Sequence, residues 1–382
     1  MSHGQALDPR IAPGPLAPVE WKTEEPSEGI VHLETTFPSP VPSGIPNNDI
    51  VPFRLFMPQG TGPFPFVLVT HYLGATDLRA EVSLATELAK QGIAAGVLTL
   101  PYHLQRTPPG ARSGELAIRP DPAALRITMF QAVEDARRAI DVAQQRPEIG
   151  QGGVGAFGTS LGAIVTALLY GVEPRVEKAA FLLGGVDIAK IIWTSSRVVP
   201  VRDVLRRKGY TEARLREELK PIEALTYLPR EKPGDAFVIQ GRFDTVVPRA
   251  SSNALIAAIP GTKVLELETG HYGGIFVQHR LLHEVSRFFV EEFAGKAFEP
   301  AKQIYAPTLR LGVSVDPLRG FDVGIGLDLF RLDRHGDAFG TAFLSPRGPS
   351  LFMGQRLGGG FAFGVIGSTK GASLGAFWST VL

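Results

Sequence analysis

Short apolar runs alternate with longer amphipathic segments through the middle of the chain. Phe66 to Thr70 and Ile93 to Leu98 are apolar runs typical of fully buried strands. Between them, the pattern over Arg79 to Gln91 predicts a helix that Gly92 ends as a C-cap. A longer helix is predicted from Asp121-Pro122 to about Gln145, because Asp is a favoured N-cap and Pro suits the first turn. Further strands are predicted at 153–157, 178–183, 236–240 and 263–267, and further helices at 161–170 and 280–293.

This alternation of strands and helices predicts βαβ units and a mostly parallel sheet flanked by helices. Two more strands, Ile30 to Phe37 and Ile50 to Met57, precede it and are joined by a turn rich in Pro, Gly and Asn. We therefore expect an α/β catalytic domain over residues 30–299, after a flexible Pro-rich lead at 1–29. Residues 187–228 are too long for a simple connection and carry helical patterns, so we expect a small helical lid there.

A different pattern begins near residue 300, where Gly is frequent and apolar residues recur at every second position. The alternation predicts a C-terminal antiparallel β region over residues 300–382. It places apolar side chains from Phe321 to Leu329 on one face, and Gly324, Gly326 and Asp328 on the other. A barrel that crosses a membrane needs at least about 8 strands, and this region supplies five or six. We therefore expect a small module without catalytic residues, packed on the core or on a second copy, with peripheral lipid contact as a further hypothesis.

Composition excludes several classes of protein. The net charge of +1 gives no general attraction to nucleic acid, so no nucleic-acid partner is expected. The chain has no Cys, which excludes a disulfide framework and a thiol nucleophile. No segment approaches the roughly 20 apolar residues of a membrane-spanning helix. The first 18 residues carry no apolar core of signal-peptide length, so we expect a cytoplasmic protein.

The pentapeptide Gly158-Thr159-Ser160-Leu161-Gly162 matches the pattern G-x-S-x-G. A serine nucleophile needs its hydroxyl lifted clear of the sheet on a strained strand-to-helix turn, and the flanking glycines let strand and helix approach. A predicted strand precedes this pattern and a predicted helix follows it. The alternative is an ordinary Gly-rich turn, but this context favours Ser160 as the nucleophile.

A serine nucleophile also needs a base and a carboxylate that orients it. Asp244 follows a predicted strand and His271 follows the next one, so both can reach the same edge of a parallel sheet. Asp244 would fix the tautomer of the histidine, and it would also suit a helix cap. Asp187 is the rival carboxylate, but it opens the lid. His279 and His283 fall on the closing helix, so we predict His271 as the base.

The segment Thr70-His71-Tyr72-Leu73-Gly74 follows the strand that begins at Phe66. Acyl transfer needs two backbone N–H groups directed at the developing oxyanion. We predict the N–H of Leu161 as one donor and that of Leu73 as the other, with Tyr72 as the alternative to Leu73. His71 is then expected to hold the loop.

Together these segments resemble the α/β-hydrolase superfamily, and within it the branch of dienelactone hydrolases and acyl esterases. The resemblance covers residues 30–297 and rests on the elbow, on G-R-F-D-T-V-V-P around Asp244 and on G-H-Y around His271. One departure is H-Y-L-G in place of the family's H-G-x-G, so that Tyr72 stands where a glycine is usual. The resemblance implies an α/β-hydrolase fold and a cofactor-free hydrolase that acts on esters through an acyl-enzyme.

We therefore expect a serine hydrolase whose partner is a small-molecule ester or acyl substrate. A peptidase or amidase with the same triad, and an inactive scaffold used for binding, are the alternatives. Neither a metal-binding H-E-x-x-H motif nor a P-loop occurs, so no metal site or cofactor is expected. A homo-oligomer would form through the C-terminal β region.

Overall fold

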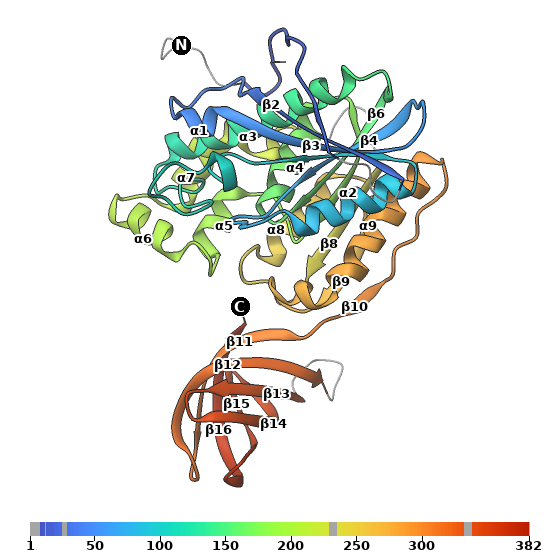
Figure 1. Ribbon diagram of the computed structural model, residues 1–382. Helices are drawn as coiled ribbons and strands as arrows, with labels where there is room; N and C mark the ends of the chain where they lie inside the picture. Colours follow the sequence, from blue (N-terminus) through green and yellow to red (C-terminus); the bar gives the residue numbers. More distant parts are fainter. Residues whose placement is uncertain (1–7, 12, 25–28, 229–234, 332–337, 382) are drawn as a thin grey trace.

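A computed structural model describes residues 8–11, 13–24, 29–228, 235–331 and 338–381 (Figure 1). Within these ranges the chain forms a ten-stranded sheet and, C-terminal to it, a closed barrel of six strands. The order of the sheet is β1-β2-β3-β5-β4-β6-β7-β8-β9-β10. Its strands are β1 (Lys22–Thr23), β2 (Ile30–Pro38), β3 (Ile50–Pro58), β4 (Phe64–Thr70), β5 (Ala94–Leu98), β6 (Ile149–Thr159), β7 (Val176–Leu182), β8 (Asp235–Gly241), β9 (Lys263–Glu268) and β10 (Gln303–Tyr305).

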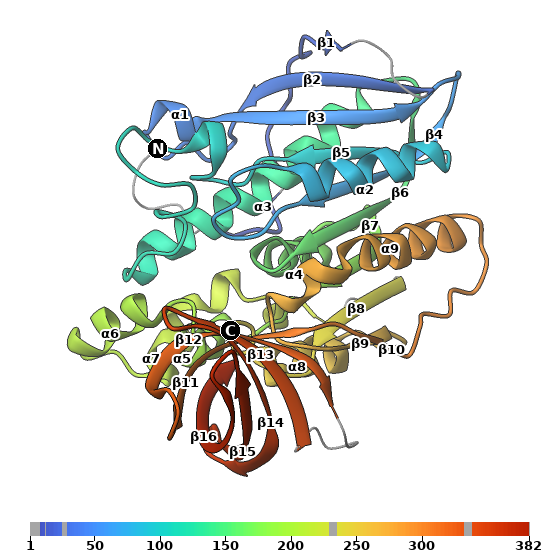
Figure 2. The same ribbon diagram turned by 60° about the horizontal axis from the view of Figure 1, so that its bottom comes forward.

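The sheet is parallel from β5 through β4, β6, β7, β8 and β9 to β10, and antiparallel at β1, β2 and β3. Helices cover both faces, and two apolar cores fill the space between helices and sheet (Figures 1 and 2). One core holds buried side chains of α3 (Pro122–Gln144) and α4 (Leu161–Val172), and the other those of α2 (Arg79–Lys90) and α9 (Gln278–Phe293). Three short helices, α1 (Pro46–Asp49), η1 (Leu104–Arg106) and η4 (Gly273–Val277), complete this part of the chain. The predicted α/β fold is therefore confirmed.

The long connection between β7 and β8 is helical, as predicted. It contains α5 (Ile188–Thr194), α6 (Val199–Arg207), α7 (Glu212–Leu219), η2 (Lys220–Ile222) and η3 (Ala224–Thr226). Helix α5 packs on α6 and α7, and α7 packs on α3 of the core. In the parts of the chain that the structure describes, no helix combines the length and the apolar character needed to cross a membrane.

Two core elements carried too weak a pattern for prediction. Helix α8 (Arg249–Ala258) buries Ser251, Ser252 and Leu255, so small polar residues occupy most of its inner face. Strand β10 is only three residues long and pairs in parallel with β9. The boundary that we assigned after residue 299 therefore lies before the last strand of the core sheet.

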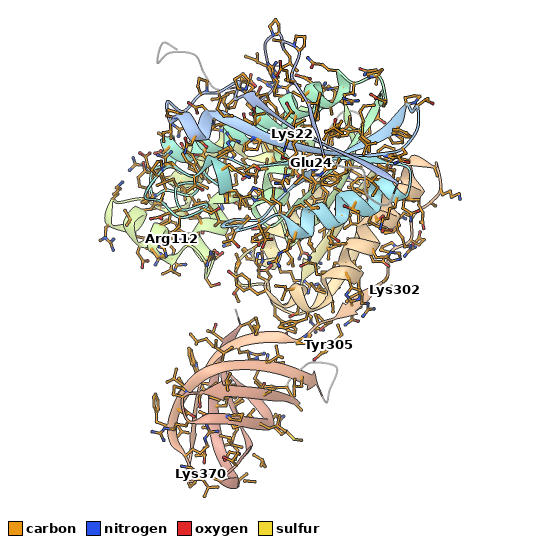
Figure 3. The ribbon with its side chains drawn as sticks, viewed as in Figure 1. Lys22, Glu24, Arg112, Lys302, Tyr305 and Lys370 are labelled. Carbon is orange, nitrogen blue, oxygen red and sulfur yellow. The ribbon has the colours of Figure 1, made fainter. Side chains whose placement is uncertain are left out.

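The C-terminal β region begins after β10 and closes on itself. Its strands are β11 (Thr308–Asp316), β12 (Gly320–Arg331), β13 (Ala338–Ser345), β14 (Gly348–Gly358), β15 (Phe361–Ser368) and β16 (Gly371–Val381), each antiparallel to its neighbours, with β16 returning to β11. In Figure 3, Tyr305 lies at the junction with the core and Lys370 at the far end of the barrel. The predicted antiparallel region is thus confirmed.

The core does not cover the apolar face of this region, which was one of the two arrangements that we expected. Cover by a second copy of the chain stays a prediction. The sheet closes with Phe343, Phe352 and Phe377 packed inside the barrel. The alternating apolar side chains from Phe321 to Leu329 therefore point outward, and Phe321 is 60% exposed. The sequence pattern separates the two faces of a sheet but does not say which face a closed sheet turns inward.

Candidate active site

Ser160 lies on a sharp turn between β6 and α4, with φ of 54° and ψ of −112°. Positive φ is uncommon for a residue with a Cβ, and here it lifts the side chain off the end of the strand. A Cβ on Gly158 would lie 2.3 Å from backbone atoms of Gly162, and one on Gly162 would lie 2.6 Å from the carbonyl oxygens of Thr70 and His71. Both glycines of the pentapeptide are therefore required by close backbone contacts.

The structure brings Ser160, His271 and Asp244 together, although 111 residues separate the serine from the histidine. Oγ of Ser160 lies 2.9 Å from Nε2 of His271, and Nδ1 of His271 lies 2.7 Å from Oδ2 of Asp244. Because the carboxylate can only accept at Nδ1, that nitrogen carries the proton and Nε2 accepts the serine hydroxyl. His271 and Ser160 are each 8% exposed, so the three groups form a nearly buried polar chain.

The rival carboxylate, Asp187, lies outside this chain. Its Oδ1 accepts the N–H of Lys190 at 3.1 Å, as expected for the N-cap of α5, and its Oδ2 pairs with Arg216 at 2.9 Å. Asp244 instead accepts the N–H groups of Val246 and Val247 through Oδ1, each at 2.8 Å. The carboxylate thus orders its own loop as well as His271. Among the side chains that the structure describes, no group of three or more His, Cys, Asp or Glu could hold a metal ion.

Two buried histidines hold the loop after β4, which carries Tyr72 and Leu73. His71 donates from Nδ1 to the carbonyl of Tyr72 at 2.9 Å and accepts the N–H of Leu100 at Nε2 at 3.0 Å. His103 accepts the N–H of Gly74 at Nε2 at 3.0 Å. Burial lowers the pKa of His71 to about 3 and that of His103 to about 4, so both stay neutral and can accept. The N–H of Gly74 is therefore bonded to His103. The N–H groups of Tyr72 and Leu73 remain the candidate oxyanion donors of this loop.

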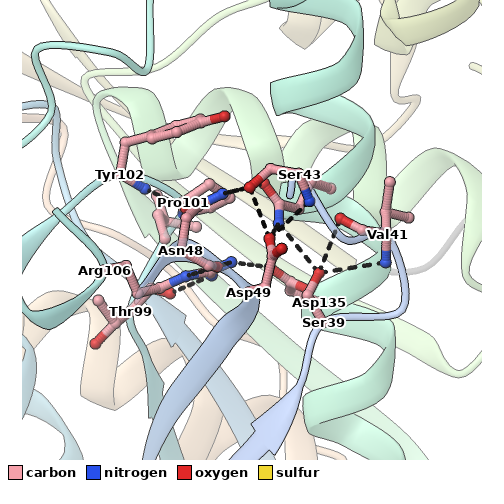
Figure 4. Close-up of polar contacts among 12 residues, drawn as sticks. Ser39, Val41, Ser43, Asn48, Asp49, Thr99, Pro101, Tyr102, Arg106 and Asp135 are labelled. Carbon is pink, nitrogen blue, oxygen red and sulfur yellow. Dashed lines mark hydrogen bonds and ion pairs between the residues drawn. The ribbon is translucent and has the colours of Figure 1, made fainter. Parts of the chain in front are cut away.

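The role of His103 in holding this loop was not predictable from the sequence. His103 lies 29 residues beyond Gly74, and nothing local marks the two as partners. The same holds for a buried polar network that fixes the segment around His103 (Figure 4). There Arg106 pairs with Asp135 of α3 at 2.8 Å and donates to the carbonyl oxygens of Asn48 and Thr99, and neither side chain of the ion pair is exposed.

The loops of Asp244 and His271 also contact the helical insertion and the barrel. Ser196 of the insertion donates its N–H to the carbonyl of Thr245 at 2.8 Å. The hydroxyl of Thr245 donates to the carbonyl of Val381 at the end of β16, at 3.1 Å. On the histidine loop, the hydroxyl of Thr269 lies 3.2 Å from that of Thr308, the first residue of β11. The candidate site therefore lies between the insertion and the near end of the barrel.

Comparison with known proteins identifies the fold. No family model matches the chain. Esterase EstD of Thermotoga maritima is 28% identical to this chain over 119 residues. The matched segment is 30% of this chain and only 26% of the length of that curated relative. Among solved structures, an acetyl xylan esterase from Paenibacillus sp. R4 superposes with a TM-score of 0.55 at 18% identity, over 72% of this chain and 87% of its own. Acetyl xylan esterase 1 from Thermoanaerobacterium sp. JW/SL YS485 gives 0.51 at 15% identity, over 71% and 89%. These two likenesses show that the chain has an α/β-hydrolase fold, with a mostly parallel sheet flanked by helices.

Proposed function

We propose that the chain is a serine hydrolase that cleaves a carboxylic ester through an acyl-enzyme intermediate. The observation that carries this proposal is the unbroken hydrogen-bonded chain from Asp244 through His271 to Ser160, with the serine on a strained turn at the head of α4. This arrangement of nucleophile, base and orienting carboxylate suits acyl transfer. The match to an esterase over 119 residues supports an ester in preference to an amide.

In the first step, Oγ of Ser160 attacks the ester carbonyl and Nε2 of His271 takes the hydroxyl proton. Asp244 stabilises the imidazolium that forms, since its carboxylate is already bonded to Nδ1. The tetrahedral intermediate then collapses, the C–O bond to the alcohol breaks, and His271 returns the proton to the departing oxygen. Water attacks the acyl-serine by the same route and releases the carboxylic acid.

The oxyanion of each tetrahedral intermediate needs preorganised donors. The N–H of Leu161 is suited to this role because Leu161 is the first residue of α4 and has no acceptor within the helix. The N–H of Leu73, or that of Tyr72, would supply the second donor from the loop that His71 and His103 hold. The positive end of the α4 dipole also favours negative charge at this position.

The test combines a covalent probe with turnover of a small soluble ester such as p-nitrophenyl acetate. Wild-type protein should react with a fluorophosphonate at one serine and hydrolyse the ester. Ser160→Ala should lose the label and several orders of magnitude of turnover, while its far-UV circular dichroism stays unchanged. Ser286→Ala, which removes a buried hydroxyl from α9, is the control and should keep both activities. Near-normal turnover in Ser160→Ala would refute the proposal.

A further inference from the structure

The outer surface of the C-terminal barrel is apolar on every strand. Taking one side chain from each strand in order, Leu311, Ile325, Leu344, Met353, Phe363 and Leu374 are between 43% and 65% exposed. We call the outward apolar side chains of β11 to β16 the barrel belt. Soluble proteins rarely expose a contiguous apolar surface of this kind, which marks a site of interaction.

Where the structure describes them, the charged side chains of the strands point into the barrel. Arg310 and Asp328 form an ion pair inside the barrel at 2.8 Å, with side chains 4% and 0% exposed. Arg319, in the turn before β12, pairs with Asp322 at 2.8 Å, and both are 3% exposed. A barrel stable in water would be expected to place these charges outside and its large apolar side chains inside. This barrel has the opposite arrangement, although each buried charge needs a partner to offset the cost of removing it from water.

The spread of the barrel belt over all six strands distinguishes two kinds of cover, a second copy of the chain and lipid hydrocarbon. A second copy of the chain would cover one side of the barrel, since a typical interface takes about 800 Å² from each partner. The belt includes residues of all six strands of a closed barrel, so one partner surface leaves most of it in water. Lipid hydrocarbon is apolar in every direction and gives no partner to a charged group, which fits both the belt and the inward charges.

We propose that the barrel belt contacts lipid hydrocarbon and holds the chain at a lipid layer. The contacts from Thr245 to Val381 and from Thr269 to Thr308 fix the near end of the barrel to the loops of Asp244 and His271. Binding through the belt therefore brings the candidate active site to the lipid surface. This inference rests on the exposure and charge of the barrel alone, so it stands or falls independently of the proposed esterase activity.

The first experiment measures co-sedimentation of the full-length protein with phosphatidylcholine vesicles. Wild-type protein should bind, and binding should persist at about 1 M salt, where attraction between exposed charges is screened beyond about 3 Å. The variant Ile325→Lys/Phe363→Lys places two charges in the belt and should reduce partitioning by roughly tenfold or more. Ile127→Lys, at a 42% exposed apolar position on α3, is the matched control and should bind as wild type does.

A second measurement does not depend on whether the belt variant folds. Trp378 lies on the outer surface of β16 and is 38% exposed. Lipids brominated along their acyl chains should quench its fluorescence in the wild-type protein, and Trp378→Phe should remove most of that quenching. Absence of vesicle binding and quenching would overturn the proposal. A stable dimer in the ultracentrifuge that leaves vesicles unbound would also overturn it, and would assign the belt to a second copy.

Discussion

The carboxylate of Asp244 holds His271 from a position that is itself fixed. Its Oδ2 lies 2.7 Å from Nδ1 of His271, while Oδ1 accepts two backbone N–H groups of its own loop at 2.8 Å. The carboxylate therefore cannot rotate without losing three hydrogen bonds. This geometry favours one tautomer of the imidazole, with the lone pair of Nε2 directed at Ser160.

Asp244→Asn should reduce the turnover number by about four orders of magnitude. The amide can present an N–H towards Nδ1, which would favour the tautomer that cannot take the serine proton. Asp187→Asn, which removes a carboxylate that pairs with Arg216, should change turnover by less than about tenfold, because this carboxylate is not bonded to the histidine. Initial rates on a soluble ester measure both, and a larger loss in Asp187→Asn would show that the orienting carboxylate is misassigned.

Gly158→Ala should destroy the geometry of the elbow. The new Cβ would lie 2.3 Å from the carbonyl carbon and oxygen of Gly162, and backbone atoms cannot move aside as a flexible side chain can. We expect a loss of at least about 2 kcal/mol in unfolding free energy, and a loss of about 100-fold or more in the rate of phosphonate labelling.

The control for this substitution lies on the same strand. Gly152 has no atom within 4 Å of the position a Cβ would take. Gly152→Ala should therefore label and unfold as wild type does in urea titrations. Equal behaviour of the two variants would mean that the close approach of β6 and α4 is not a constraint.

Glu81 makes the stability of the chain depend on pH. It lies in the first turn of α2, is 2% exposed, and its Oε2 has no hydrogen-bond partner among the residues that the structure describes. Burial raises its pKa from 4.5 to about 7. As pH rises from about 4.5 to about 7, the unfolded state releases this proton before the folded state does, so the folded state loses stability.

Glu81→Gln should remove that dependence. At about pH 8 the variant should be more stable than wild type by about 1–3 kcal/mol, and at about pH 4 the two should be nearly equal. Urea unfolding at both pH values measures the difference. Glu87→Gln, at a partly exposed position on the same helix, should show no such trend. A constant offset between wild type and Glu81→Gln at both pH values would contradict the argument.

The parts of the site that could be predicted have local sequence signals. Ser160 lies between two glycines that the turn requires, and Asp244 and His271 each follow a strand whose apolar run is readable. The contacts that hold the loop after β4 were not predictable, because His103 and Gly74 meet only once β4 and β5 lie side by side. The residues around a single loop histidine do not predict such a contact.

The C-terminal region illustrates a different limit. The alternation from Phe321 to Leu329 predicted a strand and its two faces correctly. It did not predict closure, because the pairing of β11 with β16 joins residues such as Val313 and Trp378 that are far apart in the chain. Only closure decides that Asp328 lies inside with Arg310 and that the apolar face lies outside.

The ion pair of Arg106 with Asp135 lies entirely within the protein interior. Both side chains are 0% exposed, and the guanidinium also donates to the carbonyls of Asn48 and Thr99, so it ties α3 to the segment that carries His103. Arg106→Met should lower the free energy of unfolding by about 3–5 kcal/mol, because it leaves the Asp135 carboxylate buried without its partner. It should also lower turnover of a soluble ester, since His103 would hold Gly74 less firmly.

The double variant Arg106→Met/Asp135→Leu removes both charges and should be more stable than Arg106→Met alone, although the carbonyls of Asn48 and Thr99 still lack their donor. Urea unfolding of the four proteins forms a double-mutant cycle, and additive losses would show that the two charges do not depend on each other.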